Sequence, residues 1–386
     1  MRRTGGETVR AFIPNPLPPV PELRPDTETT DLLERANRAL GRVDGLATLL
    51  PDYALFLYFY IRKEAVLSSQ IEGTQSSISE LLLYENEEAP GVPLEDVKEV
   101  SRYVAALEFG VQRVRDGFPL SLRLIRAVHR VLLAGGRGSE KEPGEFRRSQ
   151  NWVGGTRPGN ALYAPPPGDE VVACMGALER FLHDEPARTP TLLKVALSHV
   201  QFETIHPFLD GNGRVGRLLI TLILCAEGAL SEPLLYLSVY LKQHRSTYYD
   251  LLQAVRMEGD WEAWLRFFLT GVQEAAEQAA STAQRILGLF ERDRKKVGTV
   301  GRAGSSLLRV LDYFHTSPLA SASRIAGTLH LSAPTVGQAL RRLTELGVLQ
   351  EVSGRRWGRL FVYREYLDIL SEGTDPLRSP SLARLP

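Results

Sequence analysis

The chain has 386 residues, of which 43% are hydrophobic and 24% are charged, and its 46 Lys and Arg residues balance 46 Asp and Glu residues. This composition excludes an intrinsically disordered chain and predicts two or three globular domains that each bury a core of their own. The sequence shows no secretory signal and no apolar run near the roughly 20 residues of a membrane span, so we expect a cytoplasmic protein without a membrane partner.

The first 25 residues are rich in proline and predict an extended segment that lies over the surface of the protein. Helical periodicity follows and covers most of the chain, so the fold class that we predict is mainly α. Between residues 135 and 168, Gly, Pro, Asn and Arg with scattered aromatic residues predict an irregular loop or a short hairpin. The predicted helices cover residues 30–50, 53–83, 97–116, 121–134, 170–183, 192–205, 214–227, 233–255 and 260–288.

The end of the second predicted helix carries two polar residues on one face. Ser68 and Glu72 are four positions apart, and Gly73, directly after them, is a typical helix stop. Taken alone, this pattern is most often a solvated helix face.

The most informative run is residues 206–217, with the sequence HPFLDGNGRVGR. Pro207 favours an extended backbone at His206, so the preceding helix should end there. The dipeptides Asp-Gly and Asn-Gly follow and favour turns, and an apolar helix begins directly after them. The free N–H groups at the start of that helix, together with its dipole, predict an anion-binding site.

The side chains of this run suit a polyphosphate. Arg214 and Arg217, at positions i and i+3, lie on one face of the first helical turn and offer two forked donors. Asp210 supplies a hard oxygen ligand for Mg²⁺. His206 is a titratable base at the edge of the same turn.

A zinc site is an alternative for the same part of the chain. His199, Glu203 and His206 are spaced at i, i+4 and i+7 on one helix face. Pro207 weakens this interpretation because it ends the helix at His206, and the His-Glu-x-x-His order of zinc proteases is absent. We therefore expect His199 to be a packed or capping residue.

The run matches the signature His-Pro-Phe-x-Asp-Gly-Asn-Gly-Arg-x-x-Arg without a mismatch, and the chain thereby resembles the Fic family. The resemblance implies a compact helical core that transfers AMP from ATP to a hydroxyl side chain of a protein, with pyrophosphate leaving. It implies that His206 deprotonates the Tyr, Ser or Thr of the target and that Asp210 holds Mg²⁺. Arg214 would contact the β-phosphate and Arg217 the γ-phosphate, with phosphate cradled by the turn and by the Asn212 amide. The nucleotide-binding residues implied in the motif are Gly211, Asn212, Gly213, Arg214, Gly216 and Arg217.

The same resemblance gives the second helix a different meaning. Ser68, Glu72 and Gly73 match the inhibitory pattern of the family, Ser/Thr-x-x-x-Glu-Gly/Asn. The match implies that Glu72 pairs with Arg217, occupies the position of the γ-phosphate and holds ATP in an unproductive pose. The chain is then similar to the subclass of the family with an N-terminal inhibitory helix.

Two further segments correspond to parts of the family's site. Residues 145–166 stand in the place of the flap, a short β-hairpin that aligns the target by strand addition. Residues 243–249 supply aromatic surface near the place where relatives enclose the adenine. His244 and Tyr248 are the nucleotide contacts that we predict there, and helix packing is the alternative of about equal weight.

The C-terminal part is basic, since residues 291–366 carry 13 Lys and Arg against 6 Asp and Glu. Helices at 307–315, 321–330 and 332–347 and strands at 348–352 and 359–363 are spaced as in a winged helix-turn-helix. Such a module binds DNA or docks on a protein, and both alternatives stay open. The residues predicted to face outward are Thr335, Gln338, Arg341 and Arg342 on the third helix, and Arg355 and Arg356 in the wing.

These expectations combine into five parts and one main function. The parts are an N-terminal helical region with the inhibitory helix (1–110), a Fic core (111–290), a linker (291–303), a winged-helix domain (304–370) and a tail (371–386). The predicted function is an autoinhibited protein adenylyltransferase that uses ATP and Mg²⁺ and also modifies itself. The alternatives are a DNA-binding regulator whose Fic body senses nucleotide, and a Fic enzyme that removes AMP or transfers another group. A homodimer is compatible with the sequence.

Overall fold

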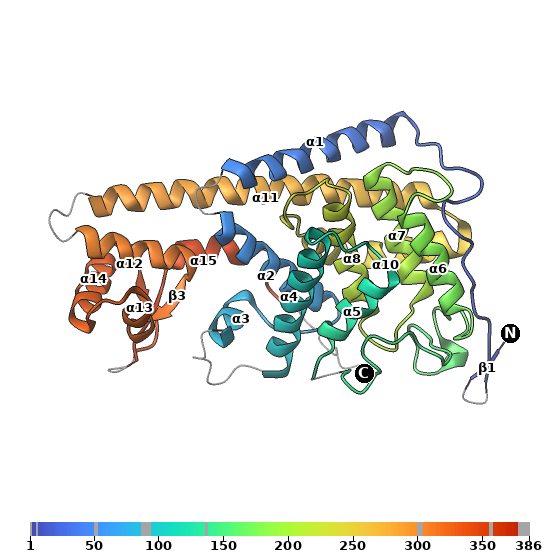
Figure 1. Ribbon diagram of the computed structural model, residues 1–386, viewed down its shortest axis with the longest axis horizontal. Helices are drawn as coiled ribbons and strands as arrows, with labels where there is room; N and C mark the ends of the chain where they lie inside the picture. Colours follow the sequence, from blue (N-terminus) through green and yellow to red (C-terminus); the bar gives the residue numbers. More distant parts are fainter. Residues whose placement is uncertain are drawn as a thin grey trace, which may run out of the picture.

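The computed structural model describes residues 2–4, 7–49, 53–85, 94–135, 138–298, 304–354 and 358–376. Over these residues the chain is mainly helical, as its periodicity predicts, with two small antiparallel sheets (Figure 1). The helices up to the C-terminal part are α1 (Thr27–Leu49), α2 (Tyr53–Ile71), α3 (Ile78–Glu85), α4 (Leu94–Arg115), α5 (Leu122–Leu132), η1 (Pro158–Asn160, a 3₁₀ helix), α6 (Val171–Leu182), α7 (Thr191–Ile205), α8 (Asn212–Ala226), α9 (Ser238–Gln243), α10 (Arg245–Glu258) and α11 (Trp261–Gly298).

Helices α7 and α8 form the centre of the main body. Helix α7 is buried from Leu192 to Ile205 except at Leu193, and a helix that is covered on all faces is typical of the core of a large domain. Helix α8 buries its apolar residues 218–224 against the surrounding helices. Helix α1 lies along the long helix α11 and covers one side of the body (Figure 1). The loop between α7 and α8 is thus held at both ends by buried helices.

Two predicted helices are each divided in the structure. The helix predicted at 53–83 ends at Ile71, because Gly73 takes a positive φ of 102°, and α3 then starts with its own cap. In that cap the N–H of Glu80 donates to Oγ of Ser77 and the N–H of Ser77 donates to Oε2 of Glu80. The helix predicted at 233–255 becomes α9 and α10, which meet at His244.

The linker predicted at residues 291–303 is wrong over its first part, since α11 stays helical to Gly298. Asp293 is fully buried there, accepts a hydrogen bond of 2.7 Å from the hydroxyl of Tyr363, and pairs with Arg292 and Lys296. The hydrogen bond from Tyr363 to Asp293 and the ion pair of Arg292 with Glu365 therefore attach α11 to the C-terminal part. Residues 299–303 lie outside the described residues.

The C-terminal part contains the three predicted helices and a three-stranded antiparallel sheet of order β3-β5-β4. Ser321 and Ser332 cap the second and third of these helices, as their side chains accept the N–H of Arg324 and of Thr335. Arg355 and Arg356 of the predicted wing lie outside the described residues. The elements are α12 (Gly304–Thr316), β3 (Leu319–Ser321), α13 (Ala322–Leu329), α14 (Ala333–Glu345), β4 (Gln350–Glu351), β5 (Leu360–Val362) and α15 (Arg364–Ser371).

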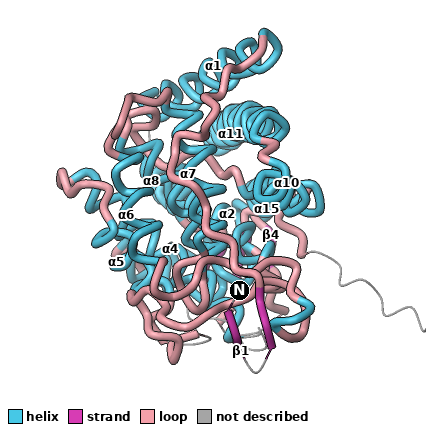
Figure 2. The backbone as a smooth tube through the Cα atoms, turned by 90° about the vertical axis from the view of Figure 1, so that its right-hand side faces the viewer, coloured by secondary structure: helices cyan, strands magenta, loops and turns pink. Residues whose placement is uncertain are grey.

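The N-terminal segment begins with a two-stranded pair, β1 (Arg2–Thr4) and β2 (Glu7–Val9), and then runs over the body as an extended chain (Figure 2). The hairpin predicted for the flap is reduced to one antiparallel bridge between Val153 and Tyr163. In the N-terminal segment, the N–H of Phe12 donates to the carbonyl of Ala164, the residue after Tyr163, at 2.9 Å. Over the described part of the chain, none of the helices combines the length and the apolar character of a membrane span.

Candidate active site

The motif at residues 206–217 folds into the loop that joins α7 to α8. Its first residue, His206, has a left-handed backbone with φ 49° and ψ 60°, so the extended conformation that we expected before Pro207 is wrong. The proline excludes the right-handed continuation of the helix, and the left-handed cap still lets the N–H of His206 donate to Phe202. Gly211 also takes a positive φ, 76°, where glycine carries no steric penalty.

Side chains from the loop and from α5 hold this shape. The Asn212 side chain accepts the N–H of Phe208 and donates to its carbonyl, both at 2.8 Å, so its amide braces the loop from within. His129 stacks on Phe208 with 3.7 Å between ring centroids. Its Nδ1 accepts the N–H of Gly144, which leaves the proton on Nε2 to donate to the carbonyl of Asp210 at 3.0 Å. The loop is thus braced by neutral side chains.

Arg147 and Arg256 hold the end of α7 around His206. Arg147 is buried and donates from Nε to the carbonyl of His206 at 2.8 Å and from Nη2 to that of Ile205 at 3.2 Å. Arg256 donates from Nη2 to the carbonyl of Glu203 at 3.3 Å. Burial, followed by the charges of Arg256 and Arg147, lowers the pKa of His206 to about 4. The imidazole is therefore neutral at neutral pH, the form that accepts a proton.

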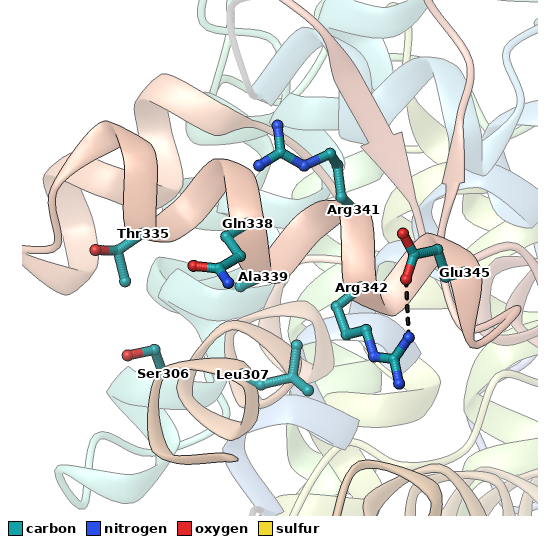
Figure 3. Close-up of a pocket in the computed structure, with 8 residues that line it drawn as sticks. All are labelled: Ser306, Leu307, Thr335, Gln338, Ala339, Arg341, Arg342 and Glu345. Atoms are coloured by element: carbon teal, nitrogen blue, oxygen red, sulfur yellow. Dashed lines mark hydrogen bonds and ion pairs between the residues drawn. The ribbon is translucent and has the colours of Figure 1, made fainter. Parts of the chain in front are cut away.

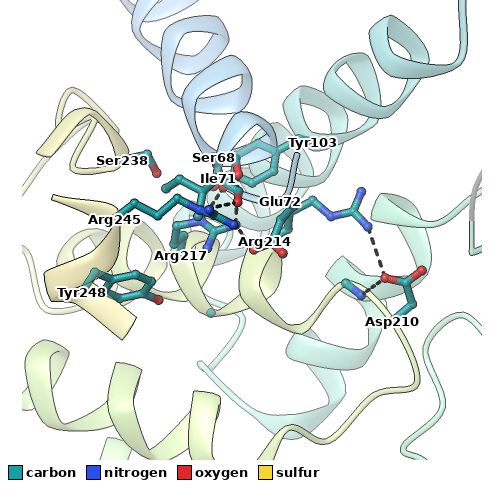
Figure 4. A network of polar contacts seen from close by, with 12 residues as sticks. Ser68, Ile71, Glu72, Tyr103, Asp210, Arg214, Arg217, Ser238, Arg245 and Tyr248 are labelled. Carbon is teal, nitrogen blue, oxygen red and sulfur yellow. Dashed lines mark hydrogen bonds and ion pairs between the residues drawn. The ribbon is translucent and has the colours of Figure 1, made fainter. Parts of the chain in front are cut away.

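Arg217 connects α8 to the end of α2 (Figure 4). Its guanidinium is almost fully buried and donates from Nε to Oγ of Ser68 at 2.8 Å and from Nη2 to the Ser68 carbonyl at 3.0 Å. Nη2 also donates to Oε1 of Glu72 at 2.6 Å. The ion pair expected between Glu72 and Arg217 is therefore present in the structure.

The Glu72 carboxylate lies against the first turn of α8. A Cβ atom at Gly213 would collide with Oε1 of Glu72, so only glycine lets the carboxylate approach this closely. Burial raises the pKa of Glu72, but the charge and hydrogen bond of Arg217 lower it by more, and the carboxylate is ionised at neutral pH. A negative group already lies at the end of α8 where the N–H groups and the helix dipole favour anions.

Arg214 turns toward the carboxylates of Glu99 and Asp210, whereas Arg217 turns toward Ser68 and Glu72 (Figure 4). Its Nη1 lies 2.6 Å from Oε1 of Glu99, and its Nη2 lies 3.6 Å from Oδ1 of Asp210. Asp210 also accepts the N–H of Gly211 at 2.6 Å and keeps 34% of its side chain exposed. Such a carboxylate fits a single inner ligand of Mg²⁺, which usually takes its other ligands from water and phosphate.

Gly216 faces α7 and not the loop. A Cβ atom there would collide with Oε1 of Glu203 and lie 3.2 Å from the ring of Phe202. Glu203 is buried, and its Oε1 has no hydrogen-bond partner among the described residues. The structure therefore shows that Gly216 permits the close approach of α7 and α8, and its predicted nucleotide contact stays a prediction.

We expect Gly216→Ala to lower the free energy of unfolding by about 1–3 kcal/mol, because the added methyl group overfills a packed helix contact. Thermal and denaturant unfolding of the purified variant measure this loss. The matched control is Gly337→Ala, at a helical position with no atom within 4 Å of the added Cβ, which should leave stability unchanged or raise it slightly. Equal stability of the two variants would contradict the proposed packing.

Of the two residues predicted to contact adenine, His244 is exposed and Tyr248 is buried. Tyr248 is buried, and its hydroxyl lies 2.9 Å from Nε2 of His199, whose Nδ1 lies 3.1 Å from the carbonyl of Gly216. Tyr248 and His199 are therefore packed in the helical core, which favours the packing alternative, and the nucleotide contact of Tyr248 stays a prediction. His244 is exposed at the junction of α9 and α10, and the aromatic residue of this segment that reaches solvent is Tyr249.

Three residues of the site were missed from the sequence. His129 lies on the buried face of α5 with Ile125 and Leu132, and a histidine at such a position was the one available signal. Arg147 stands in an irregular segment, and Arg256 lies about 50 positions after the end of α7, so no local pattern connects either of them to His206.

Comparison with known proteins agrees with this geometry. The family model described as Fic/DOC family matches residues 119–224, and the one described as Fic/DOC family N-terminal matches residues 30–112. The "Protein adenylyltransferase Fic" of Aedes aegypti is 35% identical over 201 residues, 51% of this chain and 37% of that protein. The protein of the same name from Drosophila melanogaster is 32% identical over 244 residues, 62% of this chain and 45% of that protein. The chain thus spans less than half the length of these curated relatives.

Solved structures show the same fold. A Fic family protein from Desulfovibrio desulfuricans G20 superposes with a TM-score of 0.59 at 22% identity, over 88% of this chain and 98% of that chain. Fic-1 from C. elegans superposes with a TM-score of 0.52 at 22% identity, over 68% of this chain and 73% of that chain. Since both Fic/DOC models match along residues 30–224 and the motif at 206–217 is intact, the chain belongs to the Fic family.

Proposed function

We propose that this protein is an autoinhibited adenylyltransferase that transfers AMP from ATP to a Tyr, Ser or Thr hydroxyl of a protein, itself included. The observation that carries the proposal is the loop at 206–217, in which a neutral His206 ends α7 and the buried Arg214 and Arg217 stand in the first turns of α8. The curated relatives named protein adenylyltransferases support the same activity.

The proposed transfer of AMP needs a general base and groups that stabilise the negative charge on the phosphates. Nε2 or Nδ1 of the neutral His206 would take the proton of the target hydroxyl while its oxygen attacks the α-phosphorus and the bond to pyrophosphate breaks. The N–H groups of Gly213 and Arg214 and the two guanidinium groups would stabilise the negative charge on the phosphates. Asp210 would hold Mg²⁺, which supplies further charge stabilisation at the phosphates when bound.

In this proposal, contacts of Glu72 in the same site inhibit the transferase. The Glu72 carboxylate occupies the anion-binding end of α8 and engages Arg217, the residue that the γ-phosphate would need. An anionic nucleotide must then displace an ionised side chain before it can lie along the loop in a productive pose. The basal activity of the protein should therefore be low.

Mass spectrometry of the Glu72→Gly protein tests the transferred group. We expect that incubation with Mg²⁺ and an equal mixture of ATP, CTP, GTP and UTP adds AMP to hydroxyl side chains of the protein, and that His206→Ala in the same background adds none. Addition of UMP or of phosphate alone would overturn the assignment to AMP. Absence of any adduct on the protein and on added protein targets would overturn the transferase.

A second candidate is a DNA-binding regulator whose Fic body senses nucleotide. The observation in its favour is the exposed face of α14, where a cavity of about 490 Å³ opens between α12 and α14 (Figure 3). Gln338, Arg341 and Arg342 are exposed there, although Arg342 is paired with Glu345 at 2.9 Å. Salt-dependent binding of duplex DNA that persists in His206→Ala, without AMP transfer by Glu72→Gly, would favour this candidate.

A further inference from the structure

Residues 371–376, which are the last residue of α15 and the segment after it, return from the C-terminal part to the main body. They contact the last turn of α2, directly before Glu72, and α9. The side chain of Gln70 donates from Nε2 to the carbonyl of Thr374 at 2.8 Å. Lys242 of α9 donates from Nζ to the carbonyl of Gly373 at 3.1 Å and to that of Asp375. Two buried side chains of the body thus bind the backbone of a distant segment.

Gln70 connects this segment to the inhibitory residue. The same Nε2 that binds Thr374 also donates to the carbonyl of Ser76 at 2.8 Å, on the far side of the turn that contains Glu72. Within that turn, the N–H of Gly73 donates to the carbonyl of Gln70 at 3.1 Å. The position of the Glu72 backbone therefore depends on Gln70, and Gln70 is held by residues 371–376.

The segment is attached firmly at its other end. Arg285 of α11 forms two hydrogen bonds of 2.6 Å to the carboxylate of Glu372. Tyr366 of α15 packs edge-on against Phe59 of α2, with 5.3 Å between ring centroids. In Figure 1 helix α15 lies between α12 and α2. A displacement of α15 would accordingly be passed to the end of α2.

The junction between residues 371–376 and the main body is polar, and some of its buried groups lack hydrogen-bond partners among the described residues. Several buried side-chain oxygens around it have no hydrogen-bond partner among the described residues, namely those of Ser69, Gln70 (Oε1), Thr74, Ser76 and Ser371. Water would satisfy these groups if the junction opened, so separation is less unfavourable than that of an apolar contact of equal size. A contact of this kind is suited to an element that opens and closes.

We propose that residues 371–376 are a latch that positions Glu72 through Gln70 and Lys242, so that the C-terminal part sets the strength of the brake. The inference rests on the proposed function and deepens it. Because coupling between sites is reciprocal, a nucleotide that displaces Glu72 also loosens the latch. Gln70 and Lys242 are positioning residues in this arrangement, since among the described residues their side chains donate to backbone carbonyls of residues 76 and 373–375 and not to the loop at 206–217.

The test uses full-length protein with Gln70→Leu and Lys242→Met, which remove the donors and keep most of the side-chain volume. We expect each to raise the kcat of self-modification about three- to tenfold, with Lys242→Arg close to wild type. In the Glu72→Gly background the same substitutions should have no effect, because the residue that the latch positions is already gone. Hydrogen exchange of residues 68–77 should become faster in both single variants, which is a readout independent of activity.

Arg285→Ala keeps the test valid if a buried substitution prevents folding, because the Arg285–Glu372 pair is at the surface. It should also raise activity, whereas Arg294→Ala should not. Arg294 is on α11 like Arg285, and its substitution breaks a surface pair with Asp312 of α12. If Glu72→Gly is inactive, the proposed function fails. If Glu72→Gly is active but the latch variants match wild type in kcat and exchange, or act equally without Glu72, the latch is overturned.

Discussion

Replacing Glu72 with glycine is expected to raise the rate of self-modification by AMP about tenfold to a hundredfold, which corresponds to about 1.4–2.8 kcal/mol. The pair that it removes joins a fully buried guanidinium to a carboxylate whose side chain is 31% exposed. Exposed ion pairs contribute up to about 1 kcal/mol and buried pairs cost about 3–5 kcal/mol to break, so this pair lies between the two classes. Breaking the pair should increase the rate of transfer, because it frees Arg217 and the N-terminus of α8 for the nucleotide.

Initial rates with labelled ATP and Mg²⁺ measure this gain. Glu72→Gln keeps the size and one hydrogen-bond acceptor but loses the charge, and we expect an intermediate rate. Glu108→Gln is the matched control, since this carboxylate of α4 lies 3.8 Å from Arg62 and takes no part in the Arg217 contact. A rate for Glu72→Gly within twofold of that control would show that Glu72 is not the brake.

Replacing His206 with alanine in the Glu72→Gly background should lower the rate of transfer about 10²- to 10⁴-fold, the usual contribution of a general base. The change removes the only imidazole in the loop and leaves the N-terminus of α8 and its arginines in place. Nucleotide binding, measured by calorimetry, should therefore be retained while kcat falls. His183→Ala is the control, because His183 is exposed at the end of α6. A loss of binding equal to the loss of rate would contradict the role of base.

The pH dependence of the active protein should report the same residue. Burial and the charges of Arg256 and Arg147 lower the pKa of His206 to about 4, and a base works only above its pKa. We expect kcat/KM of Glu72→Gly to stay level from pH 7 to about pH 5 and to fall below that, and Arg256→Ala to move the fall toward the ordinary value of 6.5. The charge of Glu72 raises the pKa of His206, so removing Glu72 cannot shift the decline in kcat/KM to higher pH. A fall centred near pH 6.5 in Glu72→Gly would contradict this environment for His206.

Residues distant in sequence determine most of what makes the loop work. The turn dipeptides and Pro207 are enough to predict a bend between two helices, but His206 adopts its left-handed cap within a frame supplied by Arg147, Arg256 and His129. The left-handed backbone of His206 differs from the expected extended one for this reason. Tyr248 is likewise engaged by a distant residue, since its hydroxyl lies 2.9 Å from Nε2 of His199.

Periodicity, turn chemistry and one intact motif were sufficient to predict a mainly helical Fic protein, the loop at 206–217 and the pairing of Glu72 with Arg217. These features depend on residues that are near in sequence or on a pattern of the family. Only the tertiary structure determined that α11 runs on to Gly298, that Gly216 serves helix packing, and that residues 371–376 reach the end of α2. The contact between Gln70 and Thr374 joins residues 304 positions apart, and Gly216 meets Glu203 of a different helix. No local preference encodes such contacts, because their energy exists only once the chain is folded.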